Sequence, residues 1–346
     1  MMEKLNLSSS PHFNLKYSTQ SIMLTVLIAL LPECICAIVL FGLPALLKIL
    51  ISVMCAVGFE AAFQYFTKQK IVIKNLSAAV TGVMLALVLP SSVPVWMLIL
   101  GDLIAIVVAK GLFGGIGSNT FNPALTGRAF LFISFPAAIG ASWPTPKNID
   151  AISSATILSS IKSGSVTTEN FDFLNYFLGN RAGCMGETSV LLILISFVFL
   201  LVLRVIDWRA PLAMVGTVCI GTFLDAIIGS HNFYNSILEV GMALFTGGIL
   251  FGATFMVTDY ATSPITKPGR WIFGFGCGLI TFLIRRFGGY PEGVMFSILI
   301  MNAVAPLLNN FTTRMYGYGK KGNKKPKQPK IIQEFNLKNA KEVTNE

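Results

Sequence analysis

Apolar residues fall along this chain in long blocks, and short polar segments separate them. Most blocks approach the roughly 20 residues that a helix rising about 1.5 Å per residue needs to cross a bilayer. The pattern predicts an all-α polytopic membrane protein with about ten transmembrane helices. We expect them near residues 21–41, 43–65, 76–90, 94–111, 120–139, 187–204, 210–229, 234–256, 271–284 and 291–309.

Positive charges are distributed unequally between the two sets of connecting segments. With both termini in the cytoplasm, the inner side holds Lys68, Lys70, Lys74, Lys110, Arg204, Arg209, Lys267, Arg270 and the basic tail 310–346. The outer side holds only Lys147, Lys162, Arg181, Arg285 and Arg286. The positive-inside rule favours this orientation. It makes 1–20 a cytoplasmic segment and places the one long loop, 140–186, outside the cytoplasm.

The predicted helices divide into two membrane halves, 21–139 and 187–309, with five helices each. An odd number of spans per half gives the halves opposite orientations, as in inverted-repeat membrane proteins. Two motif pairs fit a repeat: 80–82 (Val-Thr-Gly) precedes 113–115 (Phe-Gly-Gly), and 245–247 (Phe-Thr-Gly) precedes 287–289 (Phe-Gly-Gly). Glycines that allow close helix packing explain the same motifs. Both interpretations stay open.

Composition supports the membrane assignment and excludes several classes of site. Hydrophobic residues make up 54% of the 346 residues and charged residues 12%, far below the share in an ordinary soluble domain. Much of the net charge of +10 lies in the tail from Arg314 onward, which suits anionic lipid rather than nucleic acid. Six cysteines without a CxxC pair and only two histidines argue against a zinc, iron–sulfur or bis-histidine haem site within this chain.

The long loop contains a run of small polar residues around one threonine. Asp150 is followed by Ser153, Ser154, Ala155 and Thr156. By itself this is an ordinary loop sequence. It is similar, however, to the flavinylation motif of the RnfD and NqrB membrane subunits, in which an aspartate is followed by Ser or Thr, a small residue and Ala-Thr. Ser154 stands where glycine is common in that family.

The resemblance covers nearly the whole chain through several ordered motifs. They lie at 10–12, 22–32, 112–124, 186–189, 258–264 and 287–293, and the most specific is Phe-Gly-Gly-Ile-Gly followed by Asn119 and Phe-Asn-Pro-Ala at 121–124. The first predicted helix begins near residue 21, without the longer N-terminal extension of NqrB. The chain therefore resembles RnfD more closely than NqrB.

What the resemblance implies is an electron-relay subunit. A flavin transferase acting outside the cytoplasm would attach FMN covalently to the Thr156 hydroxyl through a phosphoester. The family works in the bacterial cytoplasmic membrane, in an Rnf complex whose other members are the A, B, C, E and G subunits and which couples ferredoxin:NAD oxidoreduction to Na+ or H+ transport. The chain has no dinucleotide fingerprint and no cluster ligands, so NAD and ferredoxin would bind elsewhere and this chain alone would catalyse nothing. The coupling ion, and a second, non-covalent flavin such as riboflavin, stay open.

Several further polar residues are candidate surroundings of the flavin, each with a plainer alternative. Glu187 and Thr188 could seat the cofactor or cap a helix. Asn119 and Asn122 follow the glycine run, where a broken helix and a tight turn are equally expected. Arg128 lies within a predicted span. Like Glu60, Asp102, Asp225 and Glu239, it is expected to pair with another group or to line a cation path.

Two other sets of polar residues are expected to have roles outside the flavin site. Three other functions compete with the electron-relay interpretation. Residues 258–264 are expected to form a capped turn. Arg285 and Arg286 are expected to attract phosphate or acidic loops of a partner, or to reach lipid headgroups. An NqrB-like quinone-reductase subunit is the nearest functional rival. A flavin-free channel or transporter is the second. A lipid-processing enzyme is disfavoured because only two histidines are present.

Overall fold

The computed structural model describes residues 18–140, 171–179, 181, 183–229, 232–289 and 292–316, and every regular element within them is helical. Three predicted regions lie wholly or mostly outside the described residues. They are the N-terminal segment before residue 18, the basic tail after residue 316, and the part of the long loop that contains Asp150, Ser153, Ser154, Ala155 and Thr156. The predictions for those residues therefore stay predictions.

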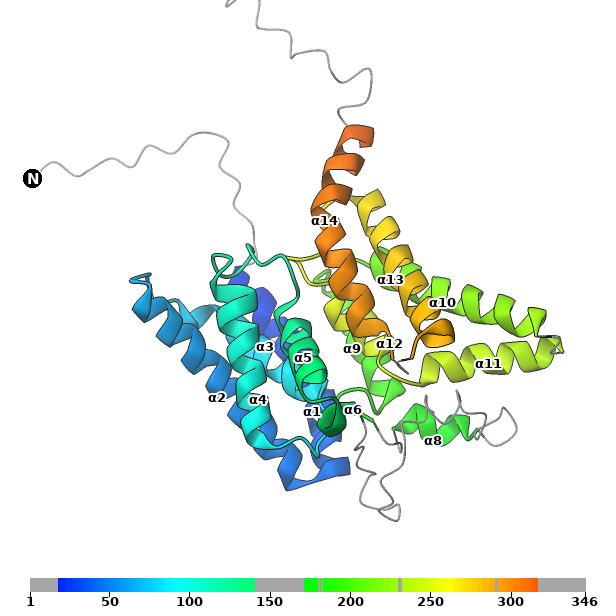
Figure 1. The fold of residues 1–346 in the computed structure, drawn as a ribbon, viewed down its shortest axis with the longest axis horizontal. Coiled ribbons are helices and arrows are strands. Elements are labelled where there is room, and N and C mark those ends of the chain that lie inside the picture. Colours follow the sequence, from blue (N-terminus) through cyan, green and yellow to red (C-terminus); the bar gives the residue numbers. More distant parts are fainter. Residues whose placement is uncertain are drawn as a thin grey trace, which may run out of the picture.

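The helices follow one another in two groups, the second of which begins with α8 inside the predicted long loop (Figure 1). The first group is α1 Thr19–Phe41, α2 Leu43–Phe66, the 3-10 turn η1 Ile73–Asn75, α3 Ser77–Leu87, α4 Val95–Leu103, the π-helix η2 Ile104–Gly111, α5 Pro123–Ser134 and α6 Pro136–Gly140. The second is α8 Phe173–Leu178, α9 Val190–Val202, α10 Arg209–Ile228, α11 Phe233–Phe245, α12 Ile249–Phe251, the π-helix η4 Gly252–Met256, α13 Lys267–Phe287 and α14 Val294–Tyr316.

Helix length and hydropathy confirm a polytopic membrane protein. Among the described residues, the helices α1, α2, α10 and α14 are long and apolar enough to cross a bilayer. The pair α11 and α12–η4 qualifies as a fifth span, bent by 64° at its break. The apolar helices α3 and α9 are shorter. The number of ten spans stays a prediction, because several predicted spans correspond to helices shorter than the bilayer.

The helix α3 is shorter than the predicted span 76–90 because its flanks end it. Leu76 has a left-handed backbone, with φ of 60°, immediately before the helix, and Pro90 follows it. All eleven residues of α3 are buried. A helix enclosed by other helices does not need lipid-spanning length, so α3 is a core element of the first group.

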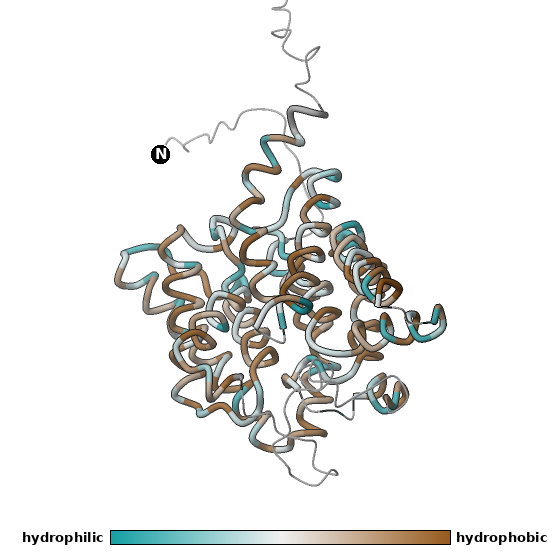
Figure 2. Tube along the Cα trace, turned by 45° about the vertical axis from the view of Figure 1, so that its right-hand side comes forward, coloured by the Kyte–Doolittle hydropathy of each residue, from teal (hydrophilic) through white to brown (hydrophobic). Residues whose placement is uncertain are grey.

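The helix α1 has a lipid-facing side and a protein-facing side. Its exposed large apolar residues recur every three or four positions, at Leu24, Ile28, Leu31, Ile35 and Val39. This spacing puts them on one face of the helix, where lipid tails rather than water are the expected contact. Figure 2 shows the hydrophobic colour along most of the helices and the hydrophilic colour mainly at turns and ends.

The two groups of helices pack in the same order. In the first, α2 packs on α3 and α4, and α4 packs on α5; in the second, α10 packs on α11 and α13, and α13 packs on α14. Contacts between the groups join α1 to α9 and α5 to α14. A five-helix repeat predicts such shared contacts, and the repeat itself stays a prediction.

Glycines allow the closest of these contacts. A Cβ on Gly82 of α3 would lie 2.8 Å from the Ser52 carbonyl oxygen of α2. In the second group, a Cβ on Gly274 of α13 would lie 2.2 Å from the Ala210 carbonyl oxygen of α10. Small residues at helix interfaces are typical of membrane proteins. The glycine-packing interpretation and the repeat are therefore compatible.

The beginning of α1 and the end of α14 lie on one side of the molecule, drawn at the top of Figure 1, whereas α6 and α8 lie on the opposite side. A cavity on the upper side is lined by Thr19 at the start of α1, Lys110 at the end of η2, Ile265 before α13 and Asn309 late in α14. The helix at the start of the long loop, α6, and the helix within it, α8, thus lie away from the described ends of the chain.

Candidate functional site

A buried ionic group joins the two helix groups beside the end of the long loop. Arg128 of α5 donates to Glu187 at 3.3 Å and to Glu292 at 2.8 Å, and its Nη2 lies 3.5 Å from the Cys184 sulfur. The backbone N–H of Gly248 donates to the second oxygen of Glu292 at 2.9 Å. We call Arg128, Cys184, Glu187, Gly248 and Glu292 the arginine–carboxylate cluster.

The start of α5 determines where Arg128 lies. Asn122 is the N-cap, and its side-chain oxygen accepts from the Leu125 N–H at 3.3 Å. Pro123 occupies the first helical turn, where its missing N–H costs nothing. Arg128 follows in the second turn of α5 and is 6% exposed. An arginine at this depth requires partners of opposite charge.

The segment before α9 brings Glu187 to Arg128. The N–H of Gly186 donates to the Leu87 carbonyl at 2.7 Å, and that of Met185 donates to the Leu89 carbonyl at 3.3 Å. A Cβ on Gly186 would lie 2.7 Å from the Leu87 Cβ. Only glycine permits this close approach, so the segment is fixed against the end of α3.

The break between α11 and α12 brings the Gly248 backbone close to both carboxylates, and its N–H donates to Glu292. A Cβ on Gly248 would lie 2.4 Å from Oε1 of Glu187 and 2.7 Å from Oε1 of Glu292. The preceding Gly247 has φ of 68°, a conformation that favours glycine. The two glycines therefore let the chain turn within the membrane and leave room for two acidic side chains.

Two further arginines hold backbone carbonyls around the cluster. Arg181 donates to the Thr188 carbonyl at 3.0 Å and to the Glu187 carbonyl. Arg285 donates to the carbonyls of Ala243 at 2.8 Å and Thr246 at 3.2 Å, at the free end of α11. Three guanidiniums and two carboxylates give the region a net positive charge when both carboxylates are ionised. Burial lowers the pKa of the loop residue Arg181.

The structure gives Arg285 partners within its own chain, and its contact with phosphate, a partner or lipid headgroups stays a prediction. Its guanidinium donates hydrogen bonds to carbonyls that the end of α11 leaves unpaired. Its Nε is buried without a partner among the described residues. Arg286 is more exposed and pairs with Asp225 at 2.9 Å. Ion pairing, one of the two expectations for the intramembrane charges, is thereby confirmed for Asp225 and also for Arg128.

The other candidate residues lie either at the start of α9 or near the upper-side cavity. Thr188 is 1% exposed, with its hydroxyl 3.9 Å from the Cys36 sulfur, and Ser189 is the N-cap of α9. Asn119 donates to the Phe121 carbonyl at 3.2 Å and lines the upper-side cavity of about 450 Å³. The structure brings Arg128 and Glu187 together, but Asn119 and the capping residue Asn122 lie before α5 and outside the arginine–carboxylate cluster.

A second buried ion pair lies near the upper side of the first group. Lys110 lies 2.7 Å from Glu60 and donates to the Ser77 hydroxyl at 2.6 Å. Lys110 lies in the π-helix η2, whose wider turns are frequent at functional positions. The pairing expected for Glu60 is confirmed.

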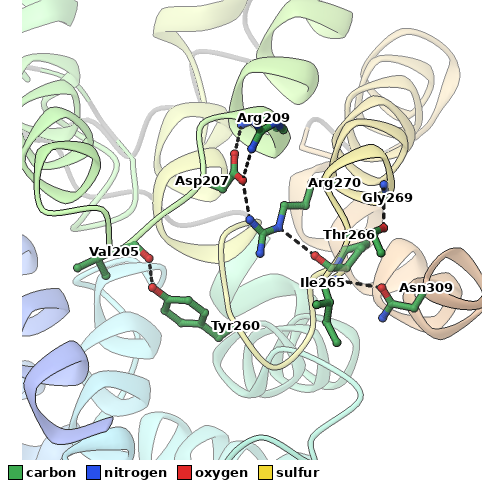
Figure 3. Close-up of polar contacts among 10 residues, drawn as sticks. Val205, Asp207, Arg209, Tyr260, Ile265, Thr266, Gly269, Arg270 and Asn309 are labelled. Carbon is green, nitrogen blue, oxygen red and sulfur yellow. Dashed lines mark hydrogen bonds and ion pairs between the residues drawn. The ribbon is translucent and has the colours of Figure 1, made fainter. Parts of the chain in front are cut away.

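A separate polar network connects the upper-side loops of the second group (Figure 3). Asp207 lies 2.6 Å from both Arg209 and Arg270, and Tyr260 donates to the Val205 carbonyl. Burial opposes ionisation of Asp207, but the Arg209 N–H and the two guanidiniums outweigh it, and its pKa lies below the usual value. The network joins the loop before α10 to the loop before α13.

The turn expected at 258–264 is confirmed next to this network. Asp259 accepts from the Thr262 hydroxyl at 3.0 Å, and the Ser263 N–H donates to the Asp259 carbonyl at 3.1 Å. Burial raises the pKa of Asp259, which is only partly offset by the bond from Thr262. The segment is a hydrogen-bonded turn with an internal acidic cap.

Sequence reasoning missed several members of the cluster. Glu292 was visible only inside the motif at 287–293, and neither Cys184 nor Gly248 carried a signal of its own. It also missed Glu33 of α1, which is 3% exposed with both carboxylate oxygens unpartnered among the described residues. Apolar helices conceal single acidic residues of this kind, because one charge barely changes the hydrophobic pattern.

Comparison with known proteins gives one family and several close relatives. The model of the NQR2, RnfD, RnfE family matches residues 6–317. The chain is 42% identical over 324 residues to the D subunit of the Na(+)-translocating ferredoxin:NAD(+) oxidoreductase complex of Acetobacterium woodii, covering 92% of this chain and 98% of that relative. It is 39% identical over 315 residues to the D subunit of the proton-translocating ferredoxin:NAD(+) oxidoreductase complex of Clostridium ljungdahlii, covering 88% and 94%.

A third relative has a less specific name. The D subunit of the ion-translocating oxidoreductase complex of Stutzerimonas stutzeri is 35% identical over 347 residues, covering 90% of this chain and 95% of that relative. In all three comparisons the match extends over nearly the full length of both proteins.

Proposed function

Because the chain belongs to the NQR2, RnfD, RnfE family, we propose that it is the D subunit of an ion-translocating ferredoxin:NAD+ oxidoreductase complex in a bacterial cytoplasmic membrane. The observation that carries this proposal is full-length similarity to D subunits of complexes named for that activity, in a protein with polytopic membrane architecture. The remaining subunits would supply the sites for ferredoxin and NAD. One relative is named for sodium and another for protons, so the names favour neither coupling ion.

Within that complex, the role proposed for this chain is to hold FMN covalently on Thr156. The Thr156 hydroxyl would be esterified by a flavin transferase, and the bound flavin supplies a carrier that takes up and releases one electron at a time. Thr156 would serve as an attachment point only. A second, non-covalent flavin such as riboflavin has no residue assigned to it.

The chemistry of the arginine–carboxylate cluster suits an anionic cofactor at the loop. The long loop leaves the first helix group after α6 and returns through Arg181 and Glu187 to α9. Arg128, Arg181 and Arg285 give that end of the bundle a net positive charge, which would attract the phosphate of FMN. Thr188 and Glu187 are buried there and position the return of the loop. Asp150, Ser153, Ser154 and Ala155 would present Thr156 to the transferase.

The distribution of exposed cations supports a cytoplasmic upper side. The exposed cations of that side lie in its connecting segments and at the start of α13; they are Lys68, Lys70, Lys74, Arg204 and Lys267. On the opposite side, Lys48, Arg181 and Arg285 are bound to backbone carbonyls, and the exposed Arg286 is paired with Asp225. By the positive-inside rule, both termini would lie in the cytoplasm and the loop with Thr156 outside it.

Flavin fluorescence after denaturing electrophoresis tests the attachment. The chain is produced together with a flavin transferase, and a fluorescent band near 37.5 kDa is expected. The band should vanish in Thr156→Val and persist in Thr167→Val, a matched change in the same loop. An equally bright band in Thr156→Val would move the attachment to another residue, whereas no band in the unaltered chain would exclude covalent flavin.

Activity measurements separate this proposal from its two rivals. Membranes with an NqrB-like subunit would reduce quinone from NADH and would show no ferredoxin activity. A flavin-free channel or transporter would carry solute into liposomes without any redox substrate. We expect ferredoxin-dependent NAD+ reduction that is lost when the gene for this chain is deleted and is restored by the unaltered chain.

A further inference from the structure

The first helix group contains a fully buried acid that the proposed electron relay does not use. Asp102 lies in the last turn of α4, next to the π-helix η2, and is 0% exposed. No ion pair joins it to any of the described residues, in contrast to Glu60, Asp207 and Asp225. An ionised carboxylate buried without a cation would be strongly destabilising.

If Asp102 is ionised, the polar groups around it have one hydrogen-bond donor too few. The Ser52 hydroxyl of α2 lies 2.8 Å from the Gly82 carbonyl oxygen and 2.9 Å from Oδ1 of Asp102. A serine hydroxyl has one hydrogen, and both neighbours are acceptors if Asp102 is ionised. One of the two short contacts would then be an oxygen–oxygen repulsion inside the bundle.

A proton on Asp102 makes both contacts favourable. The carboxylic acid donates to the Ser52 oxygen, and the Ser52 hydroxyl donates to the Gly82 carbonyl. Both separations are normal for O–H···O hydrogen bonds. The other carboxyl oxygen, Oδ2, then stays a neutral acceptor, which fits its lack of a partner among the described residues. Burying a neutral acceptor costs far less than burying a charge.

Close helix packing fixes this arrangement. A Cβ on Gly82 would lie 2.8 Å from the Ser52 carbonyl oxygen, so α3 and α2 meet directly at the site. On the other side of α4, a Cβ on Gly127 of α5 would lie 2.7 Å from the Gly101 carbonyl oxygen. Three helices therefore meet α4 within one turn of Asp102. Cys55, one turn after Ser52 on α2, is another titratable group near the site.

We propose that Asp102 is a proton-binding site, occupied in this structure and formed with Ser52 and the Gly82 carbonyl inside the first helix group. Binding joins one proton to the carboxylate and releases the same proton when the carboxylate forms, so no oxidant or reductant is needed. The inference goes beyond the proposed electron relay, because it involves neither Thr156 nor a flavin.

Infrared spectroscopy of the purified complex tests the proposal. A protonated carboxyl has a carbonyl stretch that an ionised carboxylate lacks. We expect Asp102 to contribute a band of this kind at neutral pH, and this contribution should shift in deuterated water, disappear in Asp102→Asn and persist in Asp225→Asn, whose aspartate is ion-paired. The asparagine amide can donate to Ser52 in place of the acid, so the variant should fold. The spectra are compared at equal flavin content.

A second variant keeps the test decisive if Asp102→Asn does not accumulate. Ser52→Ala removes the acceptor of the acid proton, and the same band should move to higher frequency while its intensity is retained. A band unchanged by both variants would overturn the proposal. So would a band that appears only after Na+ is withdrawn, because the carboxylate would then hold a metal ion in place of the proton.

Discussion

Nη2 of Arg128 and Oε2 of Glu292 lie 2.8 Å apart, although 164 residues separate them in the chain. The contact joins α5 of the first helix group to the segment before α14 of the second. Glu187, at the end of the long loop, shares the same guanidinium. One arginine therefore holds together the two groups and the segment that returns from the proposed flavin loop.

Removing the Arg128 guanidinium should destabilise the protein strongly. In Arg128→Met, two buried carboxylates lose their cation, and breaking a buried ion pair in this way typically costs about 3–5 kcal/mol. Arg286→Met is the matched control, because the Arg286–Asp225 pair is much more exposed and should contribute about 1 kcal/mol or less. Thermal unfolding of the purified protein in detergent measures both. Equal losses in the two variants would contradict the role given to Arg128.

A methyl group added at Gly248 should also destabilise the arginine–carboxylate cluster, in this case by crowding its carboxylates. The Cβ of Gly248→Ala would fall 2.4 Å from Oε1 of Glu187, and overpacking of this kind typically costs about 1–3 kcal/mol. At Gly216 of α10, by contrast, a Cβ meets nothing within 4 Å. Gly216→Ala should leave the melting temperature unchanged or raise it slightly, since alanine favours helix. The same unfolding assay compares the two.

The pair between Lys110 and Glu60 should show strong coupling. Lys110→Met leaves the Glu60 carboxylate buried without its cation, and Glu60→Gln leaves the ammonium without its anion. The double variant removes both charges and should be more stable than either single variant, because neither charge remains unpaired. A double variant whose loss equals the sum of the single losses would show that the two residues act independently.

The network around Asp207 should make stability depend on pH in the acidic range. Its pKa is lowered in the folded protein, so the ionised form stabilises the fold above the pKa of the unfolded chain. That contribution is lost as the pH falls through the lower, folded pKa. Melting temperatures measured from neutral to acidic pH should therefore fall less steeply in Asp207→Asn than in the unaltered protein. Parallel curves would contradict the ion pairs with Arg209 and Arg270.

Hydrophobic blocks predicted the helical membrane architecture because lipid imposes a strong, local constraint on sequence. The long helices α1, α2, α10 and α14 follow directly from it. The helix α3 was predicted too long, because its flanking backbone rather than bilayer thickness ends it. The bend of 64° after α11 follows from glycines whose sequence is equally compatible with close packing.

The candidate site was only partly predictable, because its contacts connect residues far apart in the chain. Buried charges such as Arg128 and Asp102 could be identified from their position in apolar blocks. Their partners could not, since Ser52 is 50 residues from Asp102 and Glu292 is 164 from Arg128. The contacts of Arg285 within the chain were missed because the predicted span ended at residue 284, whereas α13 continues to Phe287 and Arg285 donates to carbonyls at the end of α11.

Mass spectrometry of the proteolytic peptide that contains residue 156, taken from the native complex, tests the central claim most directly. The proposal predicts that this peptide carries the added mass of FMN linked through its phosphate, and that fragmentation places the added mass on Thr156. An unmodified peptide from a complex that is active in ferredoxin-dependent NAD+ reduction would contradict the proposed role of this chain as a carrier of covalent flavin.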